Sequence, residues 1–278
     1  MILVFGKTGQ VARELQNIEG VVALGRKEAD LSKPQACADA IRRLAPKAVI
    51  NAAAYTAVDE AEKHEALASV INGNSPTLMA RTCAEINIPL VHISTDYVFG
   101  GTLETPWIVS DPTEPQNAYG RSKLLGENGI RENCEVYAIL RTSWVISEHG
   151  SNFVKTMLHL SNTRNTLKIV NDQIGGPTPA RDIAAACVQI AYQLIDNPTK
   201  SGTYHFSGYP DVSWAELANN IFEQARRSVT VVPVATIEYP TPAQRPLNSR
   251  LDCNTTKEIF GISRPDWRLG LKVILNEL

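Results

Sequence analysis

A single stretch at the N-terminus restricts the fold of this chain more than any other. An apolar run, Ile2 to Phe5, leads into Gly6-Lys7-Thr8-Gly9-Gln10-Val11-Ala12, and Leu15 and Ile18 continue from Val11 at helical spacing. This order predicts a strand, a glycine turn and a helix. In such a turn the first glycine permits a tight bend, and the second lets backbone N–H groups approach a pyrophosphate. The stretch therefore predicts a dinucleotide-binding unit, with an ordinary turn as the alternative.

The rest of the first half continues the alternation of strand and helix. Strands are expected at 21–24, 48–54, 90–95 and 136–141, and helical patterns at 34–44, 57–65, 72–86 and after Tyr119. This alternation is typical of an α/β fold, here a Rossmann-like doubly wound parallel sheet. The rhythm ends in the C-terminal part, where Tyr239 to Pro246 is loop-like. That part is expected to form a smaller substrate lobe.

The change in rhythm also suggests where the chain divides. Residues 1–145, together with about 165–200, are assigned to the dinucleotide-binding domain. The substrate-binding lobe is expected to take 146–164 and 201–278. No internal repeat or low-complexity tract interrupts either part.

Composition excludes several classes of partner. The 278 residues are 44% apolar and 20% charged with a net charge of −2, so no basic surface for nucleic acid is expected. The five cysteines are widely spaced without a Cys-x-x-Cys pair, which favours reduced thiols in the core. Met1 leads directly into the first strand, and no apolar run approaches the roughly 20 residues that span a bilayer. We expect a cytoplasmic protein without a membrane partner.

Tyr119 and Lys123 form a pair with a clear chemical use. They are four residues apart, so a helix places the phenol and the ammonium group on one face. A positive charge near a phenol lowers its pKa from about 10 towards neutrality, which suits it to transfer a proton at physiological pH. Asn117 is a helix-capping residue type just before the pair. The alternative is an exposed helical turn with a solvated lysine.

The ends of two other strands carry residues suited to ligand contact. Ala52, Ala53 and Ala54 end the strand at 48–54, and such small residues let a cofactor lie against the backbone. Thr95 and Asp96 close the strand at 90–95, which places Thr95 on the cofactor side because ligands bind at the carboxyl ends of parallel strands. His92, between apolar neighbours, is interpreted as a core histidine.

The end of the second strand bears on cofactor choice. Gly25-Arg26-Lys27 stands where a dinucleotide fold meets the adenosine ribose, and no acid occupies these positions. Arg26 and Lys27 would neutralise a 2′-phosphate, so NADPH is favoured and NADH is the alternative. A side chain of the following Asp30-Leu31-Ser32 could reach the adenine edge. Two solvated loop charges remain the other interpretation of Arg26 and Lys27.

The chain resembles the extended short-chain dehydrogenase/reductase superfamily in three motifs that occur in the same order. They are the glycine turn, Ser94-Thr95-Asp96-Tyr97-Val98-Phe99 and Tyr119-x-x-x-Lys123. Within this superfamily the chain looks like the dTDP-4-dehydrorhamnose reductase family, and the resemblance runs almost to the C-terminus. The stretches that carry it are Gly6 to Val11, Asn51 to Asp59, Arg141-Thr142-Ser143-Trp144-Val145, Asn171-Asp172-Gln173 and Thr241 to Leu251.

This resemblance implies reduction of dTDP-4-dehydro-L-rhamnose at C4 by NADPH or NADH. It implies that Tyr119 donates a proton, that Lys123 lowers the pKa of Tyr119 and holds the ribose, and that Thr95 hydrogen-bonds the carbonyl. Asp96 and Trp144 would contact the sugar together with Thr95 and Tyr119, although a buried core tryptophan is the other interpretation of Trp144. The implied cofactor-binding residues are Gly6, Thr8, Gly9, Gln10, Val11, Arg26, Asp30, Leu31, Ala53, Ala54, Tyr55, Tyr119 and Lys123.

Two alternatives stay open on sequence grounds. Related 4,6-dehydratases carry an acid directly after Thr-Asp, where this chain has Tyr97, so simple carbonyl reduction is favoured over dehydration. The chain could instead reduce another nucleotide-linked 4-keto-6-deoxy sugar. It could also be a non-catalytic NADP-binding subunit on the same fold, although the presence of Thr95, Tyr119 and Lys123 together argues against that.

Some members of the family are described as dimers joined through a magnesium ion held by carboxylates. Here Glu14 lies in the first helix, but Arg181 stands in the stretch where a partner acid would be sought. A guanidinium group cannot be a metal ligand. We therefore expect no bound metal, and either a monomer or a homodimer.

Overall fold

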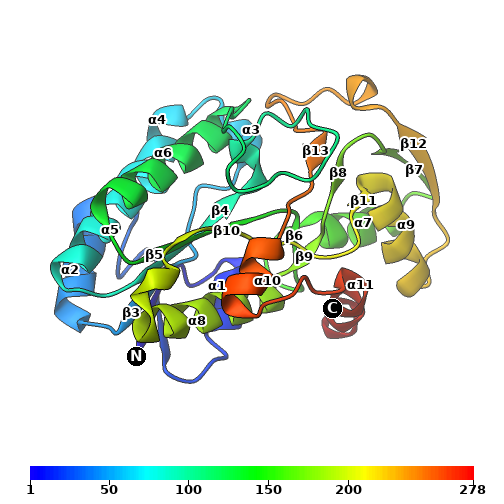
Figure 1. Cartoon of the computed structure of the whole chain (residues 1–278). Coiled ribbons are helices and arrows are strands. Elements are labelled where there is room, and N and C mark those ends of the chain that lie inside the picture. The colour runs from blue at the N-terminus through cyan, green and yellow to red at the C-terminus, as the bar shows by residue number, and fades with distance from the viewer.

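The computed structural model describes all residues from 1 to 278 and is built around one parallel sheet. Its six strands follow the order β10-β5-β4-β3-β1-β2, and every pair of neighbours is parallel (Figure 1). The strands are β1 Ile2–Phe5, β2 Val21–Leu24, β3 Ala48–Asn51, β4 Leu90–Thr95, β5 Tyr137–Thr142 and β10 Gly202–His205. The expected Rossmann-like doubly wound sheet is confirmed.

Helices cover both faces of the sheet because both faces of its central strands are apolar. One face packs against α2 Pro34–Leu44, α5 Ser75–Glu85 and α6 Ala118–Asn133, and includes Leu3, Val49, Leu90 and Ile139. The opposite face packs against α1 Gln10–Leu15 and α8 Ala180–Asp196. This layering brings the start of α6 to the carboxyl ends of β4 and β5.

The helix expected at 72–86 begins earlier and is irregular. It runs from α4 Glu65–Ser69 through one π-helical segment, Val70–Asn74, into α5. Within that segment the Asn72 amide bonds the Tyr55 backbone and the Ser122 hydroxyl. Bulges of this kind are frequent near functional sites, and this one fastens the end of β3 to α6. The short helix α3, Val58–Ala61, precedes it.

A second apolar core lies in the C-terminal lobe, where Trp267, Leu217 and Ile221 are buried. Its helices are α7 Phe153–Ser161, α9 Trp214–Gln224 and α11 Trp267–Glu277, whereas α10 Asn254–Phe260 packs against β10 and α8 of the central domain. Its strands form small sheets of two or three strands, and are β6 Val145–Ile146, β7 Thr166–Val170, β8 Ile174–Gly175, β9 Thr178–Pro179, β11 Val212–Ser213, β12 Thr230–Val234 and β13 Asn248–Ser249. Short 3-10 turns lie at Asp96–Val98, Pro198–Lys200 and Thr236–Glu238.

Strand pairing differs from the expected division at two places. Residues 166–170 form β7, which pairs with β12 of the lobe and not with the central sheet. Residues 202–205, expected in the lobe, form β10 at the edge of the central sheet beside β5. Strand runs this short carry no local signal of their partner, because the partner lies far along the chain.

Two further expectations concern the surroundings of the chain. All five cysteines are free and buried, which confirms that they are core thiols. None of the helices has the length and apolar character needed to cross a membrane.

Candidate active site

The start of α6 positions Tyr119. Asn117 caps the helix by accepting a hydrogen bond from the Gly120 N–H at 2.8 Å, as its residue type predicted. Gly120 has no side chain, and an added Cβ would lie 2.2 Å from the Tyr97 carbonyl oxygen. The helix therefore approaches the segment after β4 closely, and the Tyr119 ring packs edge-on against Tyr97 with centroids 5.6 Å apart.

Lys123 is not among the groups that shift the pKa of Tyr119 in this structure, and its expected effect on the phenol stays a prediction. Burial raises the pKa of Tyr119 above its usual value, although a hydrogen bond with the Thr95 hydroxyl opposes part of the rise. The Lys123 Nζ atom is engaged elsewhere, since it donates to the Ile93 carbonyl oxygen at 2.7 Å and lies 3.0 Å from His92 Nε2. Burial lowers the pKa of Lys123 itself to about 8. Spacing along the helix predicted a shared face but could not predict these contacts.

Thr95, Asp96 and Thr142 meet at the carboxyl ends of β4 and β5, where Thr95 and Thr142 are register partners. The Thr95 hydroxyl donates to Asp96 Oδ1 at 3.1 Å and accepts from the Tyr97 N–H at 3.2 Å. Asp96 Oδ2 and Thr142 Oγ1 are buried and have no hydrogen-bond partner. Because buried polar atoms are rarely left unpaired, this cluster is suited to bind a polar ligand.

Asp96 is electrostatically unusual. Burial raises the pKa of its carboxyl group to about 7, although hydrogen bonds with Ser249 and Thr95 oppose the rise. Near neutral pH the group can therefore carry a proton and act as a hydrogen-bond donor as well as an acceptor. Ser249 belongs to β13 of the lobe, so the site includes both parts of the chain.

A loop of the lobe lies over the start of α6, and it is held there by contacts that the sequence did not reveal. Arg245 Nη2 donates to Asp59 Oδ2 at 2.7 Å, and the Ala243 N–H donates to Asp59 Oδ1 at 3.1 Å. The Asn117 amide also donates to the Gln244 carbonyl oxygen at 2.8 Å. Arg245 Nη1 is buried without a partner, so the loop presents a free guanidinium N–H. A local signal existed only in the run of prolines around these residues.

Trp144 follows β5 in a strained, left-handed backbone conformation with φ of 46°. Its ring stacks on Trp214 with centroids 3.5 Å apart, and it also lies against Gly175, where a Cβ would be 2.8 Å from Trp144 Cε2. Trp214 is held by a hydrogen bond from its Nε1 to Gln173 Oε1 at 3.1 Å. The half-buried Trp144 ring is thus held rigidly at a strand end, in a setting that suits contact with a sugar.

The glycine turn fits a dinucleotide. Gly6 has φ of 101°, and a Cβ there would lie 3.2 Å from the backbone of Ala52 and Ala53. No side chain caps the N-terminus of α1, so backbone N–H groups there are available to a phosphate. Gln10, the first residue of α1, accepts a hydrogen bond from the side-chain amide of the lobe residue Asn152 at 2.9 Å. The turn therefore lies beside both β3 and the lobe.

The turn after β2 contains an acid that the sequence analysis missed. Arg26 and Lys27 are exposed. Asp30 is half-buried, and its carboxylate accepts a hydrogen bond from the Ser32 N–H at 2.9 Å. Glu28 folds back so that its carboxylate accepts from the Gly25 N–H at 2.9 Å and lies 3.6 Å from Lys7 Nζ. An acid therefore stands beside Gly25 at the end of β2, because a tight turn brings a residue three positions later back to it.

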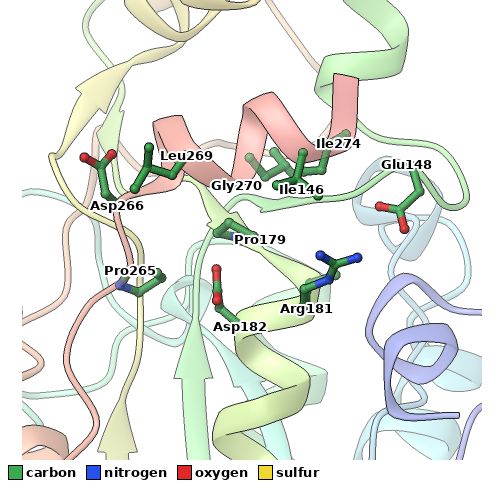
Figure 2. Close-up of a pocket in the computed structure, with 12 residues that line it drawn as sticks. Ile146, Glu148, Pro179, Arg181, Asp182, Pro265, Asp266, Leu269, Gly270 and Ile274 are labelled. Atoms are coloured by element: carbon green, nitrogen blue, oxygen red, sulfur yellow. The ribbon is translucent and has the colours of Figure 1, made fainter. Parts of the chain in front are cut away.

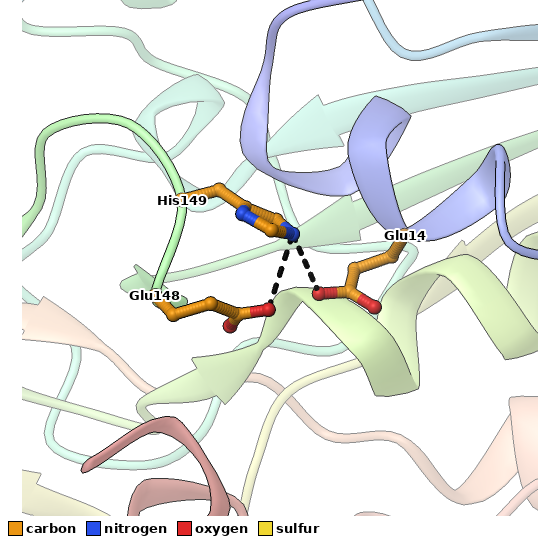
Figure 3. A group of neighbouring side chains, drawn as sticks. All are labelled: Glu14, Glu148 and His149. Carbon is orange, nitrogen blue, oxygen red and sulfur yellow. Dashed lines mark ion pairs between the residues drawn. The ribbon is translucent and has the colours of Figure 1, made fainter. Parts of the chain in front are cut away.

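A cluster of acids lies at the other side of the glycine-turn helix. Glu14, Glu148 and His149 place one donor atom each within 4.8 Å of one another (Figure 3). Arg181 Nε lies 3.7 Å from Glu14 Oε2, and its Nη2 lies 3.2 Å from Glu277 Oε1. Burial and the neighbouring Glu148 raise the pKa of Glu14 to about 7. A guanidinium group and an imidazole nitrogen thus stand where a magnesium ion would need oxygen ligands, and the absence of a metal stays a prediction.

A pocket adjoins this cluster, between the start of α8 and α11. Arg181 points across it towards Glu148, and Leu269 and Ile274 form its apolar side (Figure 2). None of its lining residues is among the residues expected to bind cofactor or substrate. We therefore place the chemistry at the ends of β4 and β5 and not in this pocket.

The fold and the site define a short-chain dehydrogenase/reductase. They combine a parallel Rossmann-like sheet and a glycine turn with a helical Tyr-x-x-x-Lys pair that lies beside a threonine at a strand end. The RmlD substrate binding domain family matches residues 1–278. A dTDP-4-dehydrorhamnose reductase of Salmonella typhimurium is 41% identical over 291 residues, which cover 100% of this chain and 97% of the relative. The chain belongs to the dTDP-4-dehydrorhamnose reductase family.

Solved structures agree. A dTDP-4-dehydrorhamnose reductase from Clostridium acetobutylicum superimposes with a TM-score of 0.92 at 36% identity, covering 99% of this chain and 98% of that one. A Bacillus anthracis dTDP-4-dehydrorhamnose reductase in complex with NADP has a TM-score of 0.91 at 35% identity, covering 100% of this chain and 99% of that one. The likeness includes the lobe as well as the central sheet.

Proposed function

We propose that this protein reduces the C4 ketone of dTDP-4-dehydro-L-rhamnose to give dTDP-L-rhamnose, with NADPH as the preferred hydride donor. One observation carries the proposal. Tyr119 and Thr95 converge with the unpartnered oxygens of Asp96 and Thr142 at the carboxyl ends of β4 and β5. Full-length similarity to enzymes that are named for this reaction supports the same substrate.

The residues divide the chemistry between them. A nicotinamide cofactor, when bound, supplies the hydride. Tyr119 is protonated at neutral pH, because the ordinary pKa of a phenol, about 10, already lies above neutrality and burial raises it further, so the phenol has a proton to give to the C4 oxygen. Thr95 orients the same oxygen with its hydroxyl group. Asp96 and Trp144 hold the sugar, the first through its buried carboxyl group and the second through its stacked ring.

Cofactor binding is assigned to the glycine turn and to the ends of β2 and β3. Backbone N–H groups from Gly6 to Val11 would hold the pyrophosphate, and Ala53 to Tyr55 would lie along the cofactor. Lys123 would contact the ribose from α6. Asp30 and Leu31 would approach the adenine, where Leu31 is buried and Asp30 half-buried.

We predict that replacing Arg26 and Lys27 together by Ala lowers kcat/KM for NADPH about tenfold to 100-fold and leaves NADH unaffected, because charged hydrogen bonds to a 2′-phosphate are lost. Glu28→Gln should act in the opposite direction, since its carboxylate at Gly25 repels a phosphate. Steady-state kinetics with both cofactors measures each effect. Equal kcat/KM values of the wild type for the two cofactors, or an unchanged ratio of these values in the double variant, would contradict binding of the 2′-phosphate by Arg26 and Lys27.

The proposed activity is tested by following NADPH oxidation with purified dTDP-4-dehydro-L-rhamnose and identifying the product by NMR. We expect stoichiometric formation of dTDP-L-rhamnose. A dTDP-4-keto-6-deoxy sugar of different ring configuration serves as the comparison substrate. Turnover of that sugar alone would support a reductase for another 4-keto-6-deoxy sugar. NADPH binding without turnover of either would support the non-catalytic subunit.

We further propose a cytoplasmic location and either a monomer or a homodimer. Five free, buried thiols suit a reducing compartment, and a reaction that uses a nucleotide sugar and NADPH needs their cellular pools.

A further inference from the structure

A chain of hydrogen-bonded, buried polar side chains begins at Lys123, one helical turn after Tyr119, and continues through His92 to Asn51. Lys123 Nζ lies 3.0 Å from His92 Nε2, and His92 Nδ1 lies 3.0 Å from Asn51 Nδ2. Asn51 Oδ1 then accepts from the Ala53 N–H at 3.2 Å. All three side chains are at most 1% exposed. The chain therefore joins the lysine of the proposed catalytic pair to the backbone at the end of β3.

The sheet register explains this arrangement. Asn51 of β3 and His92 of β4 are direct partners, so their side chains point to the same face of the sheet. Lys123 reaches that face from α6, which packs above it. Two apolar residues in place of Asn51 and His92 would continue the core formed by Val49 and Leu90. The polar pair is thus an exception to the apolar pattern around it.

Counting donors and acceptors distinguishes two states, one in which every group is paired and one that leaves the Ala53 N–H and the Asn51 Nδ2 without an acceptor in the protein. While Asn51 Oδ1 accepts from Ala53, Asn51 Nδ2 must donate to His92 Nδ1, so the neutral imidazole carries its proton on Nε2. That N–H needs an acceptor at Lys123 Nζ, which only a neutral amine provides. The neutral amine still donates to the Ile93 carbonyl oxygen. The observed pattern is therefore complete when Lys123 is uncharged.

The second state follows when Lys123 takes up one proton. An ammonium group needs a bare Nε2, so the single imidazole proton moves to Nδ1 and the Asn51 amide turns to present its oxygen. The amide then no longer accepts from Ala53. We propose that His92 is a positioning residue whose tautomer couples the protonation of Lys123 to release of the Ala53 N–H at the cofactor-lining end of β3.

No other charged group near Lys123, His92 and Asn51 takes over this coupling. Burial lowers the pKa of Lys123 to about 8, and Glu127 of the same helix opposes that shift. Glu127 is itself occupied by Arg131 of α6, Arg141 of β5 and Ser94 of β4. Burial and the Lys123 charge lower the pKa of His92 far below its usual value, so the ring stays neutral. The transition is therefore expected near the pKa of Lys123.

The inference deepens the proposed function, because it gives Lys123 a second task besides holding the ribose. Below the pKa of Lys123 the ammonium group and the free Ala53 N–H are both available to the cofactor. Above it, the amine is neutral and Ala53 is bonded to Asn51. NADPH affinity should therefore fall as the pH rises through the pKa of Lys123.

The tautomer can be observed without turnover, by NMR of the protein labelled with ¹⁵N in its histidine rings. His92 should carry its proton on Nδ1 below the pKa of Lys123 and on Nε2 above it, in one transition between about pH 7 and pH 9. The His92→Gln variant identifies the signal by its loss. One unchanged tautomer across this range, or an imidazolium form, would overturn the inference.

Asn51→Asp provides the matched perturbation, since a carboxylate of the same shape accepts from Ala53 and from His92 Nδ1 together. It should keep His92 in the Nδ1–H form throughout and shift the pH at which NADPH affinity falls upwards by at least about one unit, a tenfold change in proton affinity. Because the Ala53 N–H stays bonded in this variant, NADPH should also bind more weakly than to the wild type below the pKa of Lys123. A shift in affinity with an unaltered tautomer transition would mean a simple charge effect and contradict the coupling. Thr82→Ala removes a buried hydroxyl in α5 and should change neither readout. If sugar reduction fails while the tautomer transition is seen, the proposed function falls and the coupling stands.

Discussion

Replacing Tyr119 by Phe is expected to lower kcat about 100-fold to 10,000-fold while NADPH affinity stays nearly unchanged. The substitution removes the proposed proton donor and very little apolar surface. The phenol lies in a packed setting against Tyr97 and beside the Thr95 hydroxyl, so a phenyl ring should occupy the same position. Stopped-flow or steady-state turnover gives the first quantity, and fluorescence titration with NADPH gives the second.

Tyr204→Phe is a matched control for this experiment. It also deletes a buried phenol hydroxyl, which donates to the Lys200 carbonyl oxygen at 2.6 Å at the edge of the sheet. We expect a loss of about 1 kcal/mol in the free energy of unfolding and no change in kcat. Near wild-type turnover in Tyr119→Phe would show that another group donates the proton.

The largest effect on stability is expected from Glu127→Ala. Glu127 is fully buried and accepts from Arg141 at 2.9 and 2.7 Å, from Arg131 at 2.6 Å and from Ser94 at 2.6 Å. Removal leaves the Arg141 guanidinium buried without its counter-charge. Breaking a buried pair in this way costs about 3–5 kcal/mol, which is a large part of the stability of a typical domain. Urea unfolding at pH 7 measures the change.

An exposed pair of the same kind supplies the comparison. Glu85 also accepts from one arginine, Arg42, at 3.1 and 2.7 Å, but its side chain is 52% exposed. Glu85→Ala should therefore cost at most about 1 kcal/mol. Equal losses in the two variants would mean that burial does not decide the contribution of Glu127.

The pH dependence of the Glu127 contribution has a definite sign. Burial alone would raise the pKa of Glu127, but the hydrogen bonds and charge of Arg141 outweigh it, and the pKa is lowered. A group with a lowered pKa stabilises the folded state above its unfolded pKa of about 4.3 and loses that contribution as the pH falls through the folded value. Part of the acid sensitivity of the wild type should thus be missing in Glu127→Ala.

Much of the site could be predicted because its signals are local. The glycine turn, the Asn117 cap and the Tyr119 helix each depend on a few consecutive residues whose backbone preferences are strong. Parallel strands also align their carboxyl ends, so Thr95 and Asp96 could be placed at the ligand edge before any partner was known. The roles assigned to these residues remain predictions until the variants are measured.

Contacts between distant parts of the chain decided the rest. Asp59 and Arg245 are 186 positions apart, and Glu14 meets Glu148 and His149 only after α1 and the lobe have packed together. The stacking of Trp144 on Trp214 has the same origin.

The pair at the centre of the site shows the division most clearly. The sequence by itself determined that Tyr119 and Lys123 share a helix face, because the spacing of an α-helix is a local property. Only the tertiary structure decided that Lys123 turns to His92 and Ile93, and that burial raises the pKa of Tyr119. Side-chain partners and desolvation depend on which strands lie beneath the helix, and a single segment does not contain that information.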